Sequence, residues 1–443
     1  MEPVESPGMR NAPTRTAVLP GDRTLPRAVW LLPLLAAVFT TLCLTVPLGP
    51  FQQISRGYID LEVYRLGIEA WRAGGDLYGK LPETASGISL PFIYPPFATL
   101  ALGIFALLPW DAATVAYLVS SIGAVALTLF FVATAVWPEY ALRRRALLAC
   151  TTATPLALLL EPVFSTLDFG QVNLLLMALV AADCLARSPK WPRGMLLGIA
   201  AAIKLTPAAF VLYFLVRRDY KAAATAAISG AVATVIGFAV LPDESLEYWF
   251  GGFGNVDGLS GSAYQTNQSI QAVLARLEVP ATAATLLWLL LGAALIAAAV
   301  IAMRRAETMP ALALSINAVV ALLISPISWS HHWVWAAPAL LALVGRAVRL
   351  PWRAAVGWYV VAVVVAALFI TAPHHYLPGE NDRELAWSPV QQIVGNSYVW
   401  CSVLLLAIFL VAGAGRGSAP QDTDPDADTG EHAEGMVSAS RAG

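Results

Sequence analysis

Residues 194–216 read "GMLLGIAAAIKLTPAAFVLYFLV", an apolar run that Lys204 and Pro207 interrupt near its centre. Proline removes a backbone donor and clashes with the preceding turn of a helix. A lysine at the middle of a bilayer is costly unless it faces a polar cavity. The run therefore predicts two half-helices, 194–204 and 206–216, that meet at a polar tip at membrane depth.

The composition of the whole chain predicts an all-α, polytopic membrane protein. Of its 443 residues, 58% are hydrophobic and only 13% are charged, whereas a soluble protein carries roughly 25% charged residues. Apolar runs long enough to span a bilayer recur between residues 29 and 413. The four cysteines fall inside apolar segments without ligand-like spacing, so we expect neither a disulfide nor a cysteine metal site.

The basic residues between the apolar runs predict the orientation, because arginine and lysine prefer the cytoplasmic side. Two assignments of the membrane spans are possible. If 91–109 and 194–216 each form one plain span, the basic clusters 143–145 and 187–193 lie outside the cell. All clusters become cytoplasmic when 91–109 is an interfacial or re-entrant helix and 194–216 is broken. We therefore expect both termini in the cytoplasm and spans at approximately 29–49, 112–136, 146–162, 172–186, 194–204 with 206–216, 222–241, 282–303, 311–327, 332–348, 354–372 and 392–413.

This assignment divides the chain into five regions. Residues 1–28 and the acidic stretch 414–443 are predicted to be disordered cytoplasmic tails, because they cannot build a core. The membrane modules are 29–241, which includes a first outer loop at 50–110, and 282–413. A large extracytoplasmic loop, 242–281, joins the two modules.

The first outer loop contains carboxylates interleaved with apolar residues. The apolar spacing from Leu61 to Trp71 suits an amphipathic helix in the membrane interface. Asp60 and Glu62 would project roughly 200° apart on such a helix, so they cannot serve the same hydroxyl group. For any single carboxylate in this loop, ordinary solvation is an equally good interpretation.

Other polar residues are predicted to gather on the same outer face. Lys204 is the most informative of them, because an unpaired buried ammonium costs several kcal/mol and calls for a bound anion or an acidic partner. Helix capping and loop hydrogen bonds are the alternatives for the remaining candidates. These are Tyr94 in "FIYPPF", Gln171 and Asn173 in "DFGQVN", and Asn267 and Gln268 in "YQTNQSIQ".

The stretch "SPISWSHHWVW", residues 325–335, places His331 and His332 among tryptophans at the outer start of a span. An imidazole can donate a hydrogen bond to a phosphate oxygen, and helix N-termini favour anions. Adjacent residues of a helix diverge by ~100°, so only one of the two is expected to face a cleft. A second pair, His374 and His375, lies in a later outer loop. A metal site that combines Asp60 with the four histidines is disfavoured, because no HxxxH-type spacing is present.

Six stretches, in order, carry a resemblance to a known family: "DLEVYRLG", "FIYPPF", "GQVNLLL", "KLTP", "NQS" and "SPISWSHHWVW". Over roughly 29–413 the chain resembles the actinobacterial polyprenyl-phosphate-mannose-dependent α-mannosyltransferases of the GT-C superfamily. The resemblance implies a GT-C fold with a seven-helix core module, two juxtamembrane helices in the first outer loop, and a site that opens to the outer leaflet. Together with the spans given above, the expected fold has about 12 transmembrane segments. Leu61 is an apolar departure from the family's pattern.

The resemblance also implies roles for residues. Asp60 would be the catalytic base, and a histidine of the HHW motif, preferably His332, would contact the donor phosphate. The donor would be polyprenyl-phosphate-mannose, the acceptor a phosphatidylinositol mannoside or lipomannan, the linkage α-(1,2), and no metal or other cofactor would be needed. The remaining candidates divide into donor contacts (Lys204, His331, Gln171, Asn173 and Tyr94) and acceptor or other contacts (Glu62, Asn267 and Gln268).

Two other functions stay open from the sequence. A GT-C transferase could use another polyprenyl-phosphate sugar such as arabinose, since nothing in the sequence separates pentose from hexose donors. Broken helices with polar tips also mark transporters of lipids or sugars. A transporter is disfavoured because no internal repeat is visible and the polar residues gather on one face.

Overall fold

The computed structural model describes residues 26–45, 57–139, 143–251, 262–379 and 381–414. These residues form helices and no β-strand, with one isolated bridge between Asn267 and Trp329. The expected all-α class is thus confirmed. The predicted disorder of the two tails concerns segments that lie outside the described residues, apart from their innermost few positions, and stays a prediction.

The helices long enough to cross a membrane are fewer than expected. Five described helices pass on length and hydropathy, and up to seven do so if each of two bent pairs counts as one span. The multi-pass membrane character is confirmed, and the count of about twelve stays a prediction. The five are α1 with its 3₁₀ start (Arg27–Thr45), α4 (Trp110–Val136), α10 (Tyr220–Val240), α13 (Ala281–Arg305) and α16 with the turn after it (Trp352–Tyr376).

Shorter apolar helices fill the interior of the bundle. They are α7 (Asn173–Leu185), α8 (Met195–Ile203), α9 (Val211–Val216), α14 (Pro310–Ile324) and α15 (Ala336–Val348). Two bent pairs of helices complete the bundle. They are α5 (Arg143–Ala157) with α6 (Glu161–Phe169), and α17 (Pro389–Gly395) with α18 (Ser397–Ala414). All described residues of α7 except Leu175 and Leu179 are buried, which marks this helix as central.

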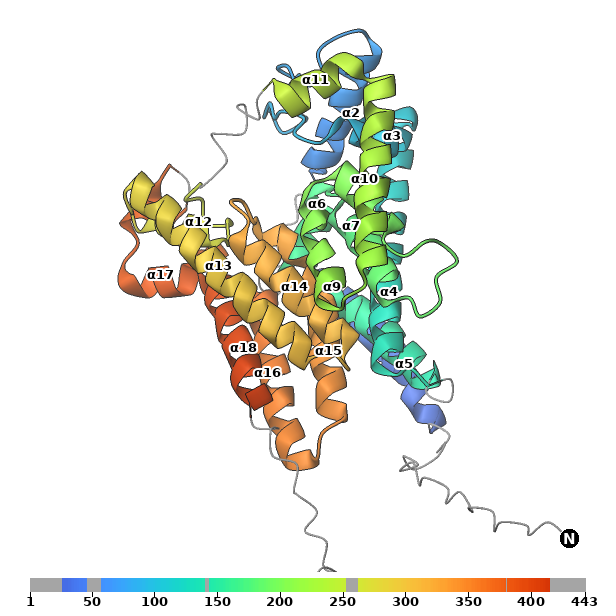
Figure 1. Ribbon diagram of the computed structural model, residues 1–443, viewed down its shortest axis with the longest axis vertical. Helices are drawn as coiled ribbons and strands as arrows, with labels where there is room; N and C mark the ends of the chain where they lie inside the picture. The colour runs from blue at the N-terminus through green and yellow to red at the C-terminus, as the bar shows by residue number, and fades with distance from the viewer. Residues whose placement is uncertain (1–25, 46–56, 140–142, 252–261, 380, 415–443) are drawn as a thin grey trace, which may run out of the picture.

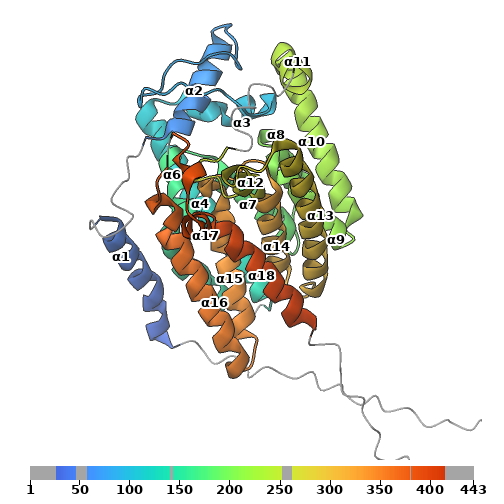
Figure 2. The ribbon, with the colours of Figure 1, turned by 90° about the vertical axis from the view of Figure 1, so that its left-hand side faces the viewer.

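A smaller layer covers one end of the bundle (Figures 1 and 2). It consists of α2 (Ile59–Arg72), α3 (Pro96–Leu107) and α11 (Pro242–Phe250). The beginning of α1 and the end of α18 lie at the opposite end (Figure 2). The helical bundle thus has one capped end, and the described chain enters and leaves at the other.

The apolar run 194–216 is broken near its centre, as predicted. Helix α8 ends at Ile203, and the backbone of Lys204 is extended, with φ −149° and ψ 131°. A 3₁₀ turn, η4 (Thr206–Phe210), with Pro207 near its start, then leads into α9. The break brings the backbone polar groups and the lysine to one point inside the bundle.

Close packing against α10 holds the first half-helix in place. A Cβ atom on Gly198 would overlap Ala226 O and Ser229 Oγ and would lie 2.6 Å from the amide nitrogen of Gly230. Small residues allow such close backbone approach between helices in a membrane. Gly198 therefore allows α8 to pack closely against α10, which is a full-length span. This packing fixes the position of the break that follows α8.

Both helices expected in the first outer loop are present. Helix α2 confirms the amphipathic prediction and buries Leu61, Tyr64 and Ile68 on one side. Helix α3 confirms that 91–109 is not a plain span, because its 12 residues rise only about 18 Å. The large loop 242–281 is partly helical, with α11 at its start and α12 (Ile270–Arg276) near its end.

One predicted span is wrong in shape. Residues 146–162 were expected to be one helix followed by a loop at 163–171, but α5 and α6 meet at a bend of 65° and most of that loop is helical. Pro162, at the start of α6, lacks the N–H group that would continue the ladder from α5. The bend turns α6 towards the capped end of the bundle.

Candidate active site

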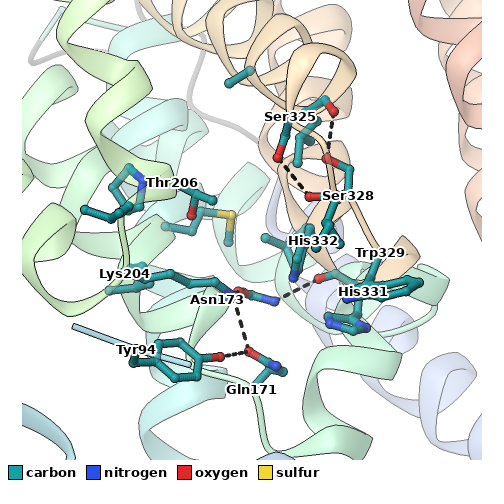
Figure 3. A pocket seen from close by; sticks show the side chains of 18 of the residues that line it. Tyr94, Gln171, Asn173, Lys204, Thr206, Ser325, Ser328, Trp329, His331 and His332 are labelled. Carbon is teal, nitrogen blue, oxygen red and sulfur yellow. Dashed lines mark hydrogen bonds between the residues drawn. The ribbon is translucent and has the colours of Figure 1, made fainter. Parts of the chain in front are cut away.

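A cavity of about 830 Å³ lies where the capping layer meets the bundle. Its wall comes from α2, α7, α14, the helix break and the 3₁₀ turn η6 (Ser330–Trp335). Seven of the ten predicted site residues line it, and the close-up in Figure 3 shows six of them around one space. The seven are Asp60, Tyr94, Gln171, Asn173, Lys204, His331 and His332.

The ammonium group of Lys204 projects from the helix break into this cavity. It donates to Asn173 Oδ1 at 3.0 Å and lies 3.5 Å from Gln171 Oε1. It also lies over the ring of Tyr94, 5.4 Å from the ring centroid. Neither of the ion pairs found among the described residues involves Lys204, so neutral groups hold its charge and leave it available to an anion.

A buried tyrosine pair orients Gln171. The hydroxyl groups of Tyr64 and Tyr94 lie 2.9 Å apart, and they donate to Gln171 Oε1 at 3.1 and 3.0 Å. The hydroxyl of Tyr117 donates to the backbone oxygen of the same glutamine at 3.0 Å. With its oxygen engaged in this way, Gln171 presents its amide nitrogen to Asp60.

Of the described residues that line the cavity, Asp60 is the only one with a carboxylate. Burial raises the pKa of Asp60 to about 6, and the hydrogen bond from Gln171 and the charge of Lys204 oppose that rise. A carboxyl group with a pKa near 6 is mostly ionised at neutral pH and is a stronger base than an ordinary aspartate. The geometry thus places one carboxyl group of raised pKa and one cation in the same space.

The end of α6 positions the helix that carries Asp60. Gly170 closes α6 with φ +76°, and a Cβ atom there would lie 2.6 Å from the Cβ atom of Leu61. The amide of Tyr58 donates to the backbone oxygen of Asp168 at 2.9 Å. These contacts on either side of Asp60 fix the start of α2 against the α6–α7 corner.

The two histidines lie in the cavity wall with different surroundings. His331 is 8% exposed, its ring lies against Phe169, and its backbone oxygen accepts from Thr166 Oγ1 at 2.7 Å and Asn173 Nδ2 at 3.1 Å. His332 is the more exposed of the two. The backbone of His331 therefore braces the wall, while His332 is better placed to meet a ligand.

Three predicted residues are not brought to the cavity. Both oxygens of Glu62 accept from the amide of Ala85 at 3.0 Å, which directs this side chain to the loop after α2. Asn267 and Gln268 are fully buried. Asn267 accepts from the amide of Ser328 in the 325–335 segment, and Gln268 donates to Gly395 O at the end of α17, so tertiary contacts occupy both side-chain amides.

Residues that the sequence analysis missed also build the site. Tyr64 lies four residues after Asp60 and therefore on the same face of α2, a spacing that would have identified it. Thr166, which is buried in α6 and holds the backbone of His331, gave no sequence signal.

The fold and the cavity together define a multi-pass membrane protein with an internal site built from one carboxylate, one ammonium group and two imidazoles. The sequence pattern of glycosyltransferase family 87 matches residues 92–326. The chain therefore belongs to glycosyltransferase family 87, and it is a glycosyltransferase.

Characterised relatives cover most of the chain. A "polyprenol-phosphate-mannose-dependent alpha-(1-2)-phosphatidylinositol mannoside mannosyltransferase" of Mycolicibacterium smegmatis is 39% identical over 394 residues, which are 83% of this chain and 87% of that protein. A protein of the same description from Mycobacterium tuberculosis is 39% identical over 80% of this chain and 84% of its own length. A pentamannoside mannosyltransferase of M. tuberculosis is 31% identical, over 68% and 70%.

Among solved structures, ArnT from Cupriavidus metallidurans bound to undecaprenyl phosphate aligns over 87% of this chain and 78% of its own, with 18% sequence identity and a TM-score of 0.39.

Gly170→Ala is predicted to lower transferase activity at least about tenfold, because the new methyl group would push Leu61, and with it Asp60, away from the cavity. Gly74→Ala is the matched control, since Gly74 has φ +78° and nothing within 4 Å of an added Cβ atom. Initial rates in proteoliposomes at equal protein content provide the measurement. If both variants lost activity equally, backbone strain alone would explain the effect, and the contact with Leu61 would not.

Proposed function

We propose that the protein transfers mannose from polyprenyl-phosphate-mannose to a phosphatidylinositol mannoside and forms an α-(1,2) linkage. The observation that carries this proposal is the joint presence of Asp60 and Lys204 in one cavity. The two relatives at 39% identity support the choice of donor, acceptor and linkage, because their names state all three. Those names favour a phosphatidylinositol mannoside over lipomannan as acceptor.

The transfer would be a single displacement with inversion. A β-linked mannosyl phosphate that gives an α-mannoside needs a base beside the acceptor hydroxyl and no second nucleophile. Asp60, the one carboxylate among the described lining residues, takes the hydroxyl proton as the acceptor oxygen bonds to the anomeric carbon. Such general-base assistance contributes typically ~10²–10⁴-fold.

Charge stabilisation would act at the other end of the reacting bond. When the bond from the anomeric carbon to phosphate breaks, the electron pair stays with the polyprenyl phosphate, which gains one negative charge. Lys204 and His332 would meet that charge, and Asn173 would keep the ammonium aimed at it through their 3.0 Å hydrogen bond. Groups preorganised where charge develops lower the barrier without further rearrangement.

The apolar part of the cavity suits a lipid-linked donor. Apart from the polar groups, the cavity is lined by apolar side chains from α7, α14 and the helix break. They include Leu176, Met177, Val180, Leu205, Phe210, Ala318 and Leu322. The first isoprenoid units of a polyprenyl chain would bury apolar surface there.

The capped end of the bundle is proposed to face the extracytoplasmic side, with both termini in the cytoplasm. The basic residues Arg143–Arg145 at the start of α5, and Arg304 and Arg305 at the end of α13, support this orientation under the positive-inside rule. The cavity under α2 and α3 would then open to the outer leaflet.

Asp60→Asn is expected to reduce turnover by at least ~100-fold, because it keeps the size and hydrogen bonding of the side chain but removes the base. Glu62→Gln is the matched control on the same helix, and its rate should stay within about threefold, since Glu62 contacts Ala85 outside the cavity. Transfer of labelled mannose by purified proteins measures both. Near-normal turnover in Asp60→Asn would eliminate the mechanism.

The pH dependence of kcat/KM should have an acid limb with an apparent pKa of about 6. The sign follows from the role of the carboxyl group: the base is ionised above its pKa, so the rate falls about tenfold per pH unit below it. The residual activity of Asp60→Asn should lack this limb. A limb near pH 4 in the wild-type protein would mean that the base is an ordinary solvated carboxylate.

Impermeant thiol labelling in intact cells tests the orientation. Lys80→Cys, in the exposed loop after α2, should react, and Lys190→Cys, in the exposed loop between α7 and α8, should react only after the membrane is opened. Both substitutions exchange an exposed lysine, so they differ only in location. The reverse labelling pattern would invert the proposed topology.

A further inference from the structure

A second cluster of titratable groups lies behind the wall of the active-site cavity. Glu161 stands at the start of α6, and His374 and His375 belong to the 3₁₀ turn η7 (Pro373–Tyr376) that follows α16. One ligand atom from each of the three residues lies within 4.8 Å of the others. None of the three lines the cavity.

The ring nitrogens of His374, Nδ1 and Nε2, find no hydrogen-bond partner within the described part of the protein. The side chain of this residue is fully buried. A buried polar group without a partner destabilises the fold, and an imidazole has two such atoms. A ligand that accepts the lone pair of one ring nitrogen would remove part of that cost.

The carboxylate of Glu161 is held as a metal ligand usually is. Its Oε1 atom accepts from Ser330 Oγ and Ser165 Oγ, each at 2.7 Å, and its Oε2 atom accepts from Tyr398 OH at 2.9 Å. Hydrogen bonds from surrounding residues orient the ligands of metal sites in this way and tune their affinity.

We propose that Glu161, His374 and His375 bind a divalent first-row transition-metal ion, for which Zn²⁺ is the natural probe. Two imidazoles and a carboxylate are a ligand set that zinc accepts. Donor atoms of a tetrahedral zinc site lie about 3.3 Å apart, and His375 Nε2 already lies 3.1 Å from Glu161 Oε1. The side chain of His375 is 40% exposed, which provides an access path and room for a water ligand.

The position of the cluster gives the ion a supporting role. Glu161 joins α6 to Ser330, the residue before the cavity histidine His331, and Thr166 of the same helix donates to the backbone of His331. An ion on Glu161 would tie η7 to this assembly. The bound metal would therefore stabilise the histidine wall of the cavity without touching the reacting atoms.

The test measures metal content of the full-length protein, purified in detergent without a polyhistidine tag, incubated with Zn²⁺ and then desalted. We expect about one equivalent of zinc in the wild-type protein and at least a tenfold lower content in His375→Ala and Glu161→Gln. His432→Ala, a histidine of the C-terminal segment outside the described residues, is the matched control and should keep the metal. Less than about a tenth of an equivalent in the wild-type protein, or unchanged content in both cluster variants, would overturn the proposal.

A second readout does not depend on the variants folding equally well. A chelator should lower the thermal stability of the wild-type protein, and added Zn²⁺ should restore it, because an ion that binds only the folded state stabilises that state. His375→Ala, at the exposed edge of the cluster, should show neither change. A chelator response of equal size in His375→Ala and the wild-type protein would contradict the site.

Discussion

The amino group of Lys204 donates to Asn173 at 3.0 Å inside a bundle of apolar helices. Much of the surrounding structure supplies the polar groups and the backbone break that stabilise the lysine at that position. An ammonium at membrane depth is expensive unless polar groups receive it. The chain meets this requirement by ending α8 at Ile203 and extending the backbone at the lysine. The close approach of α8 to α10 at Gly198 keeps the break in place.

The surrounding hydrogen bonds connect the polar groups of the site to one another. Gln171 lies between Lys204 and Asp60, because its oxygen lies beside Lys204 and the hydroxyl of Tyr94, and a hydrogen bond from its side chain lowers the pKa of Asp60. Asn173 connects the cation to the histidine wall through the backbone of His331. A displacement of Gln171 would therefore affect both Asp60 and Lys204. A displacement of Asn173 would affect Lys204 and the backbone of His331.

The sequence predicted the parts of the fold that rest on local chemistry. The break at Lys204 and Pro207 follows from an incompatible residue in an apolar run, and α2 follows from its apolar spacing. The bend between α5 and α6 was missed because hydropathy does not distinguish a straight span from two helices at an angle. Long-range partners were also missed: Glu161 meets Tyr398 across 237 positions, and no local pattern encodes that contact. The amides of Asn267 and Gln268 looked available in the sequence, yet tertiary contacts bury both.

In the proposed mechanism, the cavity holds the donor phosphate at Lys204 and the acceptor hydroxyl at Asp60, on opposite sides of the anomeric carbon. A structure of the Asp60→Asn protein with donor and acceptor bound tests this claim most directly. The account predicts a phosphate oxygen within about 3.5 Å of Lys204 Nζ, and an acceptor oxygen within about 3.2 Å of the side chain at position 60. A phosphate bound away from Lys204, or an acceptor hydroxyl next to Glu62 instead, would contradict it.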